Sequence, residues 1–235
     1  MTEQHKVWAI IPAAGIGGRM SADMPKQHLE IHGTPMLHHT LSRICASPVI
    51  DGVVIGISPQ DSAWSKNPFT HPKILGVCDG GRQRRDTVLN GLKFLDGLEQ
   101  VAQSDWALVH DAVRPCIVRQ DIQNLLTQAN DNEIGAVLGK RLVDTLKITD
   151  ESQAIQQTVD REKLWRALTP QVFRLGDLLR AIEASVADRV QVTDESMAME
   201  RAGFHPAMVE GHASNCKITT ADDLDLAALF LAKFQ

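Results

Sequence analysis

Short runs of β-branched and other apolar residues alternate along the chain with longer segments in which apolar residues recur every three or four positions. The short runs predict buried strands, and the longer spacing predicts amphipathic helices. Such alternation favours crossover units that feed a mainly parallel sheet, and it indicates an α/β fold. We expect strands at residues 7–12, 53–58, 74–78, 106–110 and 134–138, and helices at 36–44, 87–95, 121–129, 175–186, 194–201 and 221–234. The last helix has a capping-box pattern in Thr220 and Asp223.

One segment departs from this alternation. Residues 142–149 and 154–159 are predicted as two strands around a polar turn at 150–152. A hairpin that projects from a parallel sheet has an exposed edge and too little core of its own. A partner subunit is the simplest cover, so we expect a homodimer. Because the sequence has no internal repeat and no linker-like stretch, we expect one domain over residues 1–235, with a dimerisation arm at about 140–165.

Composition narrows the class of protein. The hydrophobic fraction of 43% and the charged fraction of 23% are those of an ordinary globular protein. A net charge of −5 argues against a general nucleic-acid binder. The first apolar run, residues 7–12, is too short for a signal peptide or a membrane span, so we expect a cytoplasmic protein without membrane contact. Without a Cys-x-x-Cys pair, we expect four reduced thiols at Cys45, Cys78, Cys116 and Cys216.

A glycine-rich loop follows the first predicted strand. Residues 12–20 are Pro-Ala-Ala-Gly-Ile-Gly-Gly-Arg-Met, and Pro-Lys-Gln stands at 25–27. Small residues let backbone N–H groups approach phosphates closely. Met20 excludes the dinucleotide fingerprint G-x-G-x-x-G, and a Walker loop is absent. Arg19 and Lys26 would neutralise a triphosphate and stabilise a leaving pyrophosphate; the alternative is an ordinary turn with two solvated cations.

A second basic turn lies at residues 79–87, Asp-Gly-Gly-Arg-Gln-Arg-Arg-Asp-Thr, before a predicted helix. Cations at a helix N-terminus oppose the macrodipole, so three of them at one helix start indicate a nearby anion. The cost of each cation is small and is screened by salt, so solvated side chains on a surface helix are the alternative.

His110 and Asp111 end another predicted strand. In open α/β sheets ligands bind at the carboxyl ends of strands, so Asp111 is the candidate ligand for a divalent metal, and Arg114 can grip a phosphate. A capping role for Asp111 is the alternative. Periodicity alone assigns residues 144–145, 160–161, 169–171 and 215–219 to edge strands and turns.

These motifs occur in a fixed order: Pro-Ala-Ala-Gly-x-Gly-x-Arg-Met, Pro-Lys-Gln, Asp-Gly-Gly-x-x-Arg, Val-His-Asp-Ala-x-Arg-Pro, Asp-Thr, Asp-Arg, Leu-Thr-Pro-Gln, Thr-Asp-Glu and Asn-x-Lys-Ile-Thr. Over nearly the whole chain they resemble the 2-C-methyl-D-erythritol 4-phosphate cytidylyltransferase family. The resemblance implies a Rossmann-like, mainly parallel twisted sheet of the nucleotidyltransferase type. It also implies a Mg²⁺-dependent enzyme of isoprenoid precursor biosynthesis, which transfers CMP from CTP to the polyol phosphate and releases pyrophosphate.

The resemblance assigns roles to individual residues. It implies that four residues are catalytic, with the first two on the triphosphate: Arg19, Lys26, Arg161 and Lys217. It places the nucleotide on Ala13, Ala14, Gly15, Gly17, Gly81, Thr87 and Ala112. It places the acceptor on Asp111, Arg114, Thr145, Arg161 and Thr169, where Thr145 and Arg161 serve the partner's site.

Two positions depart from the family pattern. Arg82 stands at a variable position beside the base pocket, and Thr87 stands where serine is common. Other readings remain open. They are a cytidylyltransferase for another polyol phosphate such as ribitol 5-phosphate, a non-catalytic nucleotide-binding regulator, and a dinucleotide-dependent oxidoreductase, against which Met20 speaks.

Overall fold

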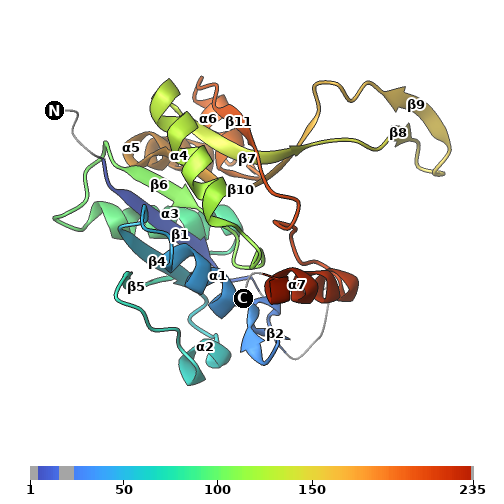
Figure 1. Cartoon of the computed structure of the whole chain (residues 1–235). Helices are drawn as coiled ribbons and strands as arrows, with labels where there is room; N and C mark the ends of the chain where they lie inside the picture. Colours follow the sequence, from blue (N-terminus) through green and yellow to red (C-terminus); the bar gives the residue numbers. More distant parts are fainter. Residues whose placement is uncertain (1–4, 16–23, 234–235) are drawn as a thin grey trace.

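A seven-stranded sheet forms the centre of the computed structural model, which describes residues 5–15 and 24–233 (Figure 1). The strand order is β11-β7-β10-β6-β1-β4-β5, in which only β10 runs antiparallel to its two neighbours. The mainly parallel α/β sheet predicted from the sequence is therefore confirmed. The strands are β1 (Val7–Pro12), β4 (Gly52–Ile57), β5 (Ile74–Asp79), β6 (Trp106–Val109), β7 (Gly135–Arg141), β10 (Trp165–Arg174) and β11 (Ala207–Glu210).

Helices cover both faces of the sheet (Figure 1). Alternate side chains of β1 show why: Val7, Ala9 and Ile11 join one buried cluster, whereas Trp8 and Ile10 join another. A strand buried on both faces needs a near-continuous apolar sequence, which β1 has. The first cluster packs under α1 (Met36–Cys45) and α4 (Arg119–Asn132); the second packs under α3 (Arg84–Asp96), α5 (Leu175–Ala187) and α6 (Glu195–Arg201).

Smaller elements complete the fold. They are the 3-10 turn η1 (Lys26–His28), the strands β2 (Glu30–Ile31) and β3 (Thr34–Pro35), and the helices α2 (Ser62–Lys66) and α7 (Ala221–Lys233). The predicted capping box of α7 is present, because the Asp223 carboxylate accepts from the backbone N–H of Thr220 at 2.8 Å. Every helix in residues 5–15 and 24–233 is too short or too polar to cross a lipid bilayer.

The predicted strands and helices are found within a few residues of their expected bounds, but the interpretation of residues 169–171 was wrong. Thr169, Pro170 and Gln171 belong to β10, which lies between β6 and β7 instead of at an edge. Proline has no backbone N–H to donate to the hydrogen bonds between strands, so a proline in the sequence argues against a central strand. The strand accommodates Pro170 because its register with β7 is interrupted between Ala167 and Gln171.

The predicted hairpin projects from the body of the molecule (Figure 1). It consists of β8 (Leu146–Thr149) and β9 (Ile155–Val159), which form an antiparallel sheet of their own. The first strand begins later than expected, because residues 142–145 have no strand pairing. We call residues 142–164 the arm. Val143, Ile148 and Ile155 on it are 75%, 50% and 64% exposed, respectively, so the arm carries apolar surface that this chain does not bury.

Candidate active site

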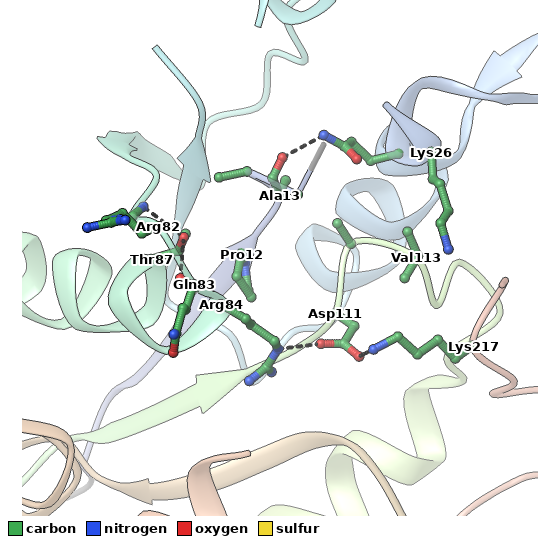
Figure 2. Close-up of a pocket in the computed structure, with 15 residues that line it drawn as sticks. Pro12, Ala13, Lys26, Arg82, Gln83, Arg84, Thr87, Asp111, Val113 and Lys217 are labelled. Atoms are coloured by element: carbon green, nitrogen blue, oxygen red, sulfur yellow. Dashed lines mark hydrogen bonds and ion pairs between the residues drawn. The ribbon is translucent and has the colours of Figure 1, made fainter. Parts of the chain in front are cut away.

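A cavity of about 300 Å³ opens beyond the carboxyl ends of β1, β5 and β6 (Figure 2). Ligands of open α/β sheets bind in this position. Nine residues that the sequence analysis assigned to the site line the cavity: Ala13, Ala14, Gly15, Lys26, Gly81, Thr87, Asp111, Ala112 and Lys217. They come from five separate stretches of the chain, so the fold brings together residues that are far apart in the sequence.

Lys26 reaches the cavity because the Pro-Lys-Gln turn is tied to β1. The buried Gln27 donates through Nε2 to the carbonyl of Ala13 at 2.7 Å. His28 is also buried, and its Nε2 lies 2.7 Å from the Asp61 carboxylate. These two contacts anchor η1 immediately after Lys26, whose side chain extends along the wall of the cavity in Figure 2.

The turn between β5 and α3 needs glycine at the cavity floor. A Cβ at Gly80 would collide with the Cβ of Ala14, and a Cβ at Gly81 would collide with Asp86. The Thr87 hydroxyl accepts from the backbone N–H of Gly81 at 3.0 Å and therefore shapes this turn. A contact of Thr87 with the nucleotide stays a prediction.

Three cations surround the carboxylate of Asp111. Arg84 Nε lies 2.8 Å from Oδ1, while Lys217 Nζ and Arg114 Nε lie 3.1 and 3.4 Å from Oδ2. Burial disfavours the charged form of Asp111, but these cations outweigh it and hold the pKa well below its usual range. The carboxylate is therefore ionised and already compensated within the protein.

The second basic turn interacts mainly with protein groups. Arg84 pairs with both Asp111 and Glu195, and Arg85 pairs with Asp86 and donates to the carbonyl of Val190. Burial lowers the pKa of Arg84, but the two carboxylates outweigh burial and raise it. The sequence predicted an anion near this helix start. For Arg84, the anions are the carboxylates of Asp111 and Glu195 in the same chain. Arg82 is exposed and lines the cavity.

A buried network holds the backbone of Asp111. Its N–H donates to Thr169 Oγ1 at 3.0 Å, and this oxygen lies 3.2 Å from His110 Nδ1. His110 Nε2 lies 3.1 Å from the carbonyl of Arg114. These partners fit one neutral tautomer, in which Nε2 donates to the carbonyl and Nδ1 accepts from the threonine hydroxyl. Burial lowers the pKa of His110 to about 4, which agrees with a neutral ring.

Protonation of His110 is expected to make stability depend on pH. The folded pKa of about 4 lies below the unfolded value of 6.5, so the unfolded chain binds the proton first as pH falls. This contribution is complete above about pH 6.5 and is lost toward pH 4. Between about pH 7 and pH 5 it amounts to about 2 kcal/mol, which urea unfolding at the two pH values measures.

The control for this prediction is His110→Gln, which removes the titrating group. Its free energy of unfolding should fall less than that of the original chain between the two pH values. Asp111 titrates below this window, because its unfolded pKa is 3.8 and its folded pKa is lower still. Equal losses in both proteins would show that the pKa of His110 is the same in the folded and the unfolded chain, which would contradict this prediction.

Other predicted site residues lie beside the cavity or away from it. Arg114 is buried next to Asp111 and donates through Nη1 to the carbonyl of Asn215 at 2.9 Å. Thr169 is buried below Asp111, whereas Thr145 and Arg161 are exposed on the arm and do not line the cavity. Gly17 and Arg19 lie outside the described residues.

The sequence analysis gave no individual role to Arg84, Glu195 or Gln27. Gln27 and Glu195 stand in quoted motifs, Pro-Lys-Gln and Thr-Asp-Glu, and Arg84 ends Asp-Gly-Gly-x-x-Arg. The motifs were therefore the available signal, but their contacts join residues up to 111 positions apart.

Comparisons with known proteins agree with this geometry. The family model of 2-C-methyl-D-erythritol 4-phosphate cytidylyltransferase matches residues 7–233. The enzyme of that name from Vibrio vulnificus is 44% identical over 226 residues, which cover 96% of this chain and 94% of the relative. A crystal structure of 4-diphosphocytidyl-2C-methyl-D-erythritol synthase superposes with a TM-score of 0.85 at 35% identity, covering 98% of this chain and all of the other. The Francisella tularensis cytidylyltransferase superposes with a TM-score of 0.82 at 33% identity, covering 96% and 99%. The chain belongs to the 2-C-methyl-D-erythritol 4-phosphate cytidylyltransferase family.

Proposed function

We propose that the chain transfers CMP from CTP to 2-C-methyl-D-erythritol 4-phosphate and forms 4-diphosphocytidyl-2-C-methyl-D-erythritol and pyrophosphate. One observation carries this function: Lys26 and Lys217 reach one cavity together with the small residues Ala13, Ala14 and Gly15. Family membership over nearly the whole chain supports the same reaction. The cytoplasm, whose reducing conditions suit the four free thiols, is the proposed compartment.

The reaction requires cations to neutralise negative charge, and it does not require a general base. An oxygen of the acceptor phosphate attacks the α-phosphorus of CTP, and the bond from this phosphorus to the bridging oxygen breaks. Pyrophosphate leaves with the electron pair, and no proton has to move. Both reactants are anions, so the protein must bring them together and neutralise charge on the leaving group. Lys26 and Lys217 line the cavity, and their positive charges support this role.

Magnesium would enter this reaction with the nucleotide. Within the described part of the chain, no group of three or more His, Cys, Asp or Glu side chains is placed to hold a metal ion. Asp111, the predicted metal ligand, already faces three cations. This donor set does not fit a site in which the protein alone holds Mg²⁺. We therefore propose that the triphosphate oxygens hold the ion and that Asp111 accepts from hydroxyl groups of the acceptor.

A pyrophosphate-release assay tests the function. CTP, ATP, GTP and UTP would each be combined with the methylerythritol phosphate, ribitol 5-phosphate and glycerol 3-phosphate in the presence of Mg²⁺. We expect release with CTP and the methylerythritol phosphate at a kcat/KM far above every other pair. Preference for ribitol 5-phosphate would assign a different acceptor. CTP binding without release from any pair would make the chain a nucleotide-binding regulator.

We also propose that the arm completes the site of a second subunit. Thr145 and Arg161 lie on the arm, away from the cavity of their own chain. Val143, Ile148 and Ile155 expose apolar surface along the same segment. An apolar arm with polar groups at its base suits insertion against a partner, whose cavity would then receive Thr145 and Arg161.

Mixing two inactive variants should restore activity if sites are shared. Lys26→Ala damages the body of a site, and Arg161→Ala damages the arm. In a mixed dimer one site would carry both substitutions and the other would carry neither. After subunit exchange, about a quarter of the original turnover per subunit is expected, because half of the dimers are mixed. Turnover of the mixture equal to the mean of the separate variants would place Arg161 in its own subunit's site.

A further inference from the structure

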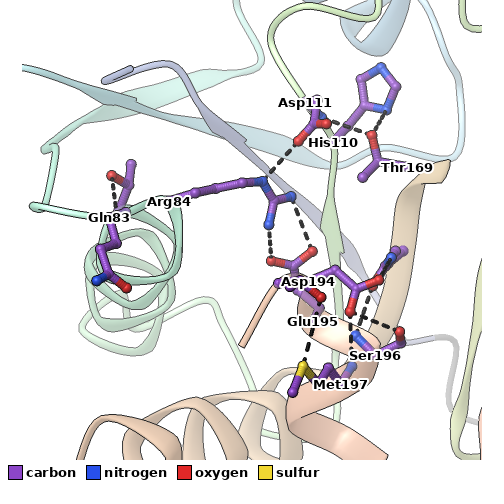
Figure 3. A network of polar contacts seen from close by, with 12 residues as sticks. Gln83, Arg84, His110, Asp111, Thr169, Asp194, Glu195, Ser196 and Met197 are labelled. Atoms are coloured by element: carbon purple, nitrogen blue, oxygen red, sulfur yellow. Dashed lines mark hydrogen bonds and ion pairs between the residues drawn. The ribbon is translucent and has the colours of Figure 1, made fainter. Parts of the chain in front are cut away.

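The Thr-Asp-Glu motif at 193–195 opens α6, a helix that does not line the cavity. Its Glu195 nevertheless reaches the site. The carboxylate receives two hydrogen bonds from Arg84, with Nη1 at 2.6 Å from Oε1 and Nη2 at 3.1 Å from Oε2 (Figure 3). The glutamate side chain is 2% exposed. A buried carboxylate in a bidentate pair with arginine has a fixed geometry.

This pair determines how Arg84 meets Asp111. Glu195 occupies the two terminal nitrogens of the guanidinium, and only Nε faces Asp111, at 2.8 Å. Without Glu195, the guanidinium would be free to turn and pair with both oxygens of Asp111. In such a pairing, Arg84 would occupy oxygen lone pairs of Asp111 that are needed to accept a hydrogen bond from a hydroxyl group of the ligand.

The N-terminus of α6 is itself fixed relative to Asp111. Gln171 accepts from the backbone N–H of Ser196 at 2.8 Å and donates to the Asp194 carboxylate at 2.9 Å. Gln171 stands two residues after Thr169, the hydroxyl of which accepts from the N–H of Asp111. The contacts therefore close a ring that holds Asp111 by its side chain on one side and by its backbone on the other (Figure 3).

We propose that Glu195 is a positioning residue for acceptor recognition, which acts through Arg84 to keep one face of the Asp111 carboxylate available for a hydroxyl group of the polyol phosphate. This inference rests on the proposed function, because it needs Asp111 to bind the acceptor. It gives α6 a role in the affinity for one substrate, beyond packing against α5. CTP, which binds the glycine-rich loop and the lysines, should be affected little.

Glu195→Gln tests the proposal, since it keeps the shape of the side chain and removes its charge. We expect the KM for the polyol phosphate to rise about ten- to a hundredfold, the range for a charge-assisted hydrogen bond, while the KM for CTP stays within about twofold. Glu200→Gln is the matched control, because Glu200 is exposed on the same helix. An equal rise of both KM values, or no rise for the acceptor, would overturn the proposal.

A double-mutant cycle separates positioning from a purely structural role. In an Arg84→Met background, Glu195→Gln should raise the acceptor KM no further, because the residue through which it acts is gone. An added rise of the same size in that background would show that Glu195 acts independently of Arg84. If Glu195→Gln fails to fold, Arg84→Lys serves instead: it keeps a charge beside Asp111, loses the bidentate pair, and should raise the acceptor KM alone.

Failure of this inference can be told apart from failure of the proposed function. If the original chain releases no pyrophosphate with any acceptor, the function is wrong. If the original chain is active and neither Glu195→Gln nor Arg84→Lys changes the acceptor KM, the function stands and the positioning role falls.

Discussion

Replacing Lys26 with alanine is expected to lower the turnover number about a hundred- to a thousandfold. The lysine lines the cavity at the carboxyl end of β1, on a turn anchored by Gln27 and His28. Negative charge grows on the departing pyrophosphate, and loss of one donor aimed at such charge costs about 2.7 to 4 kcal/mol. Lys26 belongs to none of the three buried hydrophobic clusters found in the described residues, so the fold should survive its removal.

Pyrophosphate release at saturating CTP and acceptor measures this effect, and circular dichroism monitors the fold. Lys66→Ala is the matched control, since Lys66 is an exposed lysine at the end of α2 that does not line the cavity. Arg19→Ala is expected to lose a similar factor, although Arg19 lies outside the described residues and this expectation rests on sequence alone. Near-normal turnover of both Lys26→Ala and Arg19→Ala would remove these cations from the mechanism.

The sheet could be predicted because its strands carry their own signal. Buried strands such as β1 and β4 are continuous apolar runs, and each is bounded by turn residues. β10 gave no such signal. Its first residues are partly or fully exposed, and Pro170 interrupts the pattern within a strand that tertiary contacts nonetheless place between β6 and β7. Pairing with distant strands, which local sequence does not encode, overrode the local preference.

The residues of the site could be predicted from the sequence, but the contacts between their side chains could not. Spacing along the chain placed Asp111 at a strand end and several cations in loops, and the fold confirms that location. Which cation meets which carboxylate depends on side chains that are far apart in sequence. Arg84 was expected beside an external anion, and its actual partners are Asp111 and Glu195. Hence the sequence predicted where charge gathers, and only the structure shows how it is compensated.

Asp111→Asn is expected to separate the two substrates. The substitution removes a negative charge from among Arg84, Arg114 and Lys217. The surroundings of the cavity become more positive, so CTP should bind at least as tightly as before. The acceptor loses a charged partner for its hydroxyl groups, and its kcat/KM should fall at least about a hundredfold. Calorimetric titration with CTP and steady-state kinetics with varied acceptor measure the two effects.

Loss of the carboxylate should also lower stability. Removing one partner of a buried ion pair costs about 3 to 5 kcal/mol, and Lys217, which is 45% exposed, contributes least to this loss because solvent screens it. Kinetics should therefore be measured well below the lowered melting temperature. A parallel loss of CTP affinity in a folded variant would contradict the proposal that Asp111 binds the acceptor while the lysines bind the nucleotide.

The magnesium dependence of the same variant distinguishes the two roles considered for Asp111. If the carboxylate binds acceptor hydroxyls, the Mg²⁺ concentration for half-maximal rate should stay the same in Asp111→Asn, because the ion is held by the triphosphate. If the carboxylate ligates the metal, that concentration should rise about ten- to a hundredfold, as expected when a charged ligand is lost. Three cations within 3.4 Å of this carboxylate oppose a second role in binding Mg²⁺. We therefore expect the acceptor dependence, and not the metal dependence, to change.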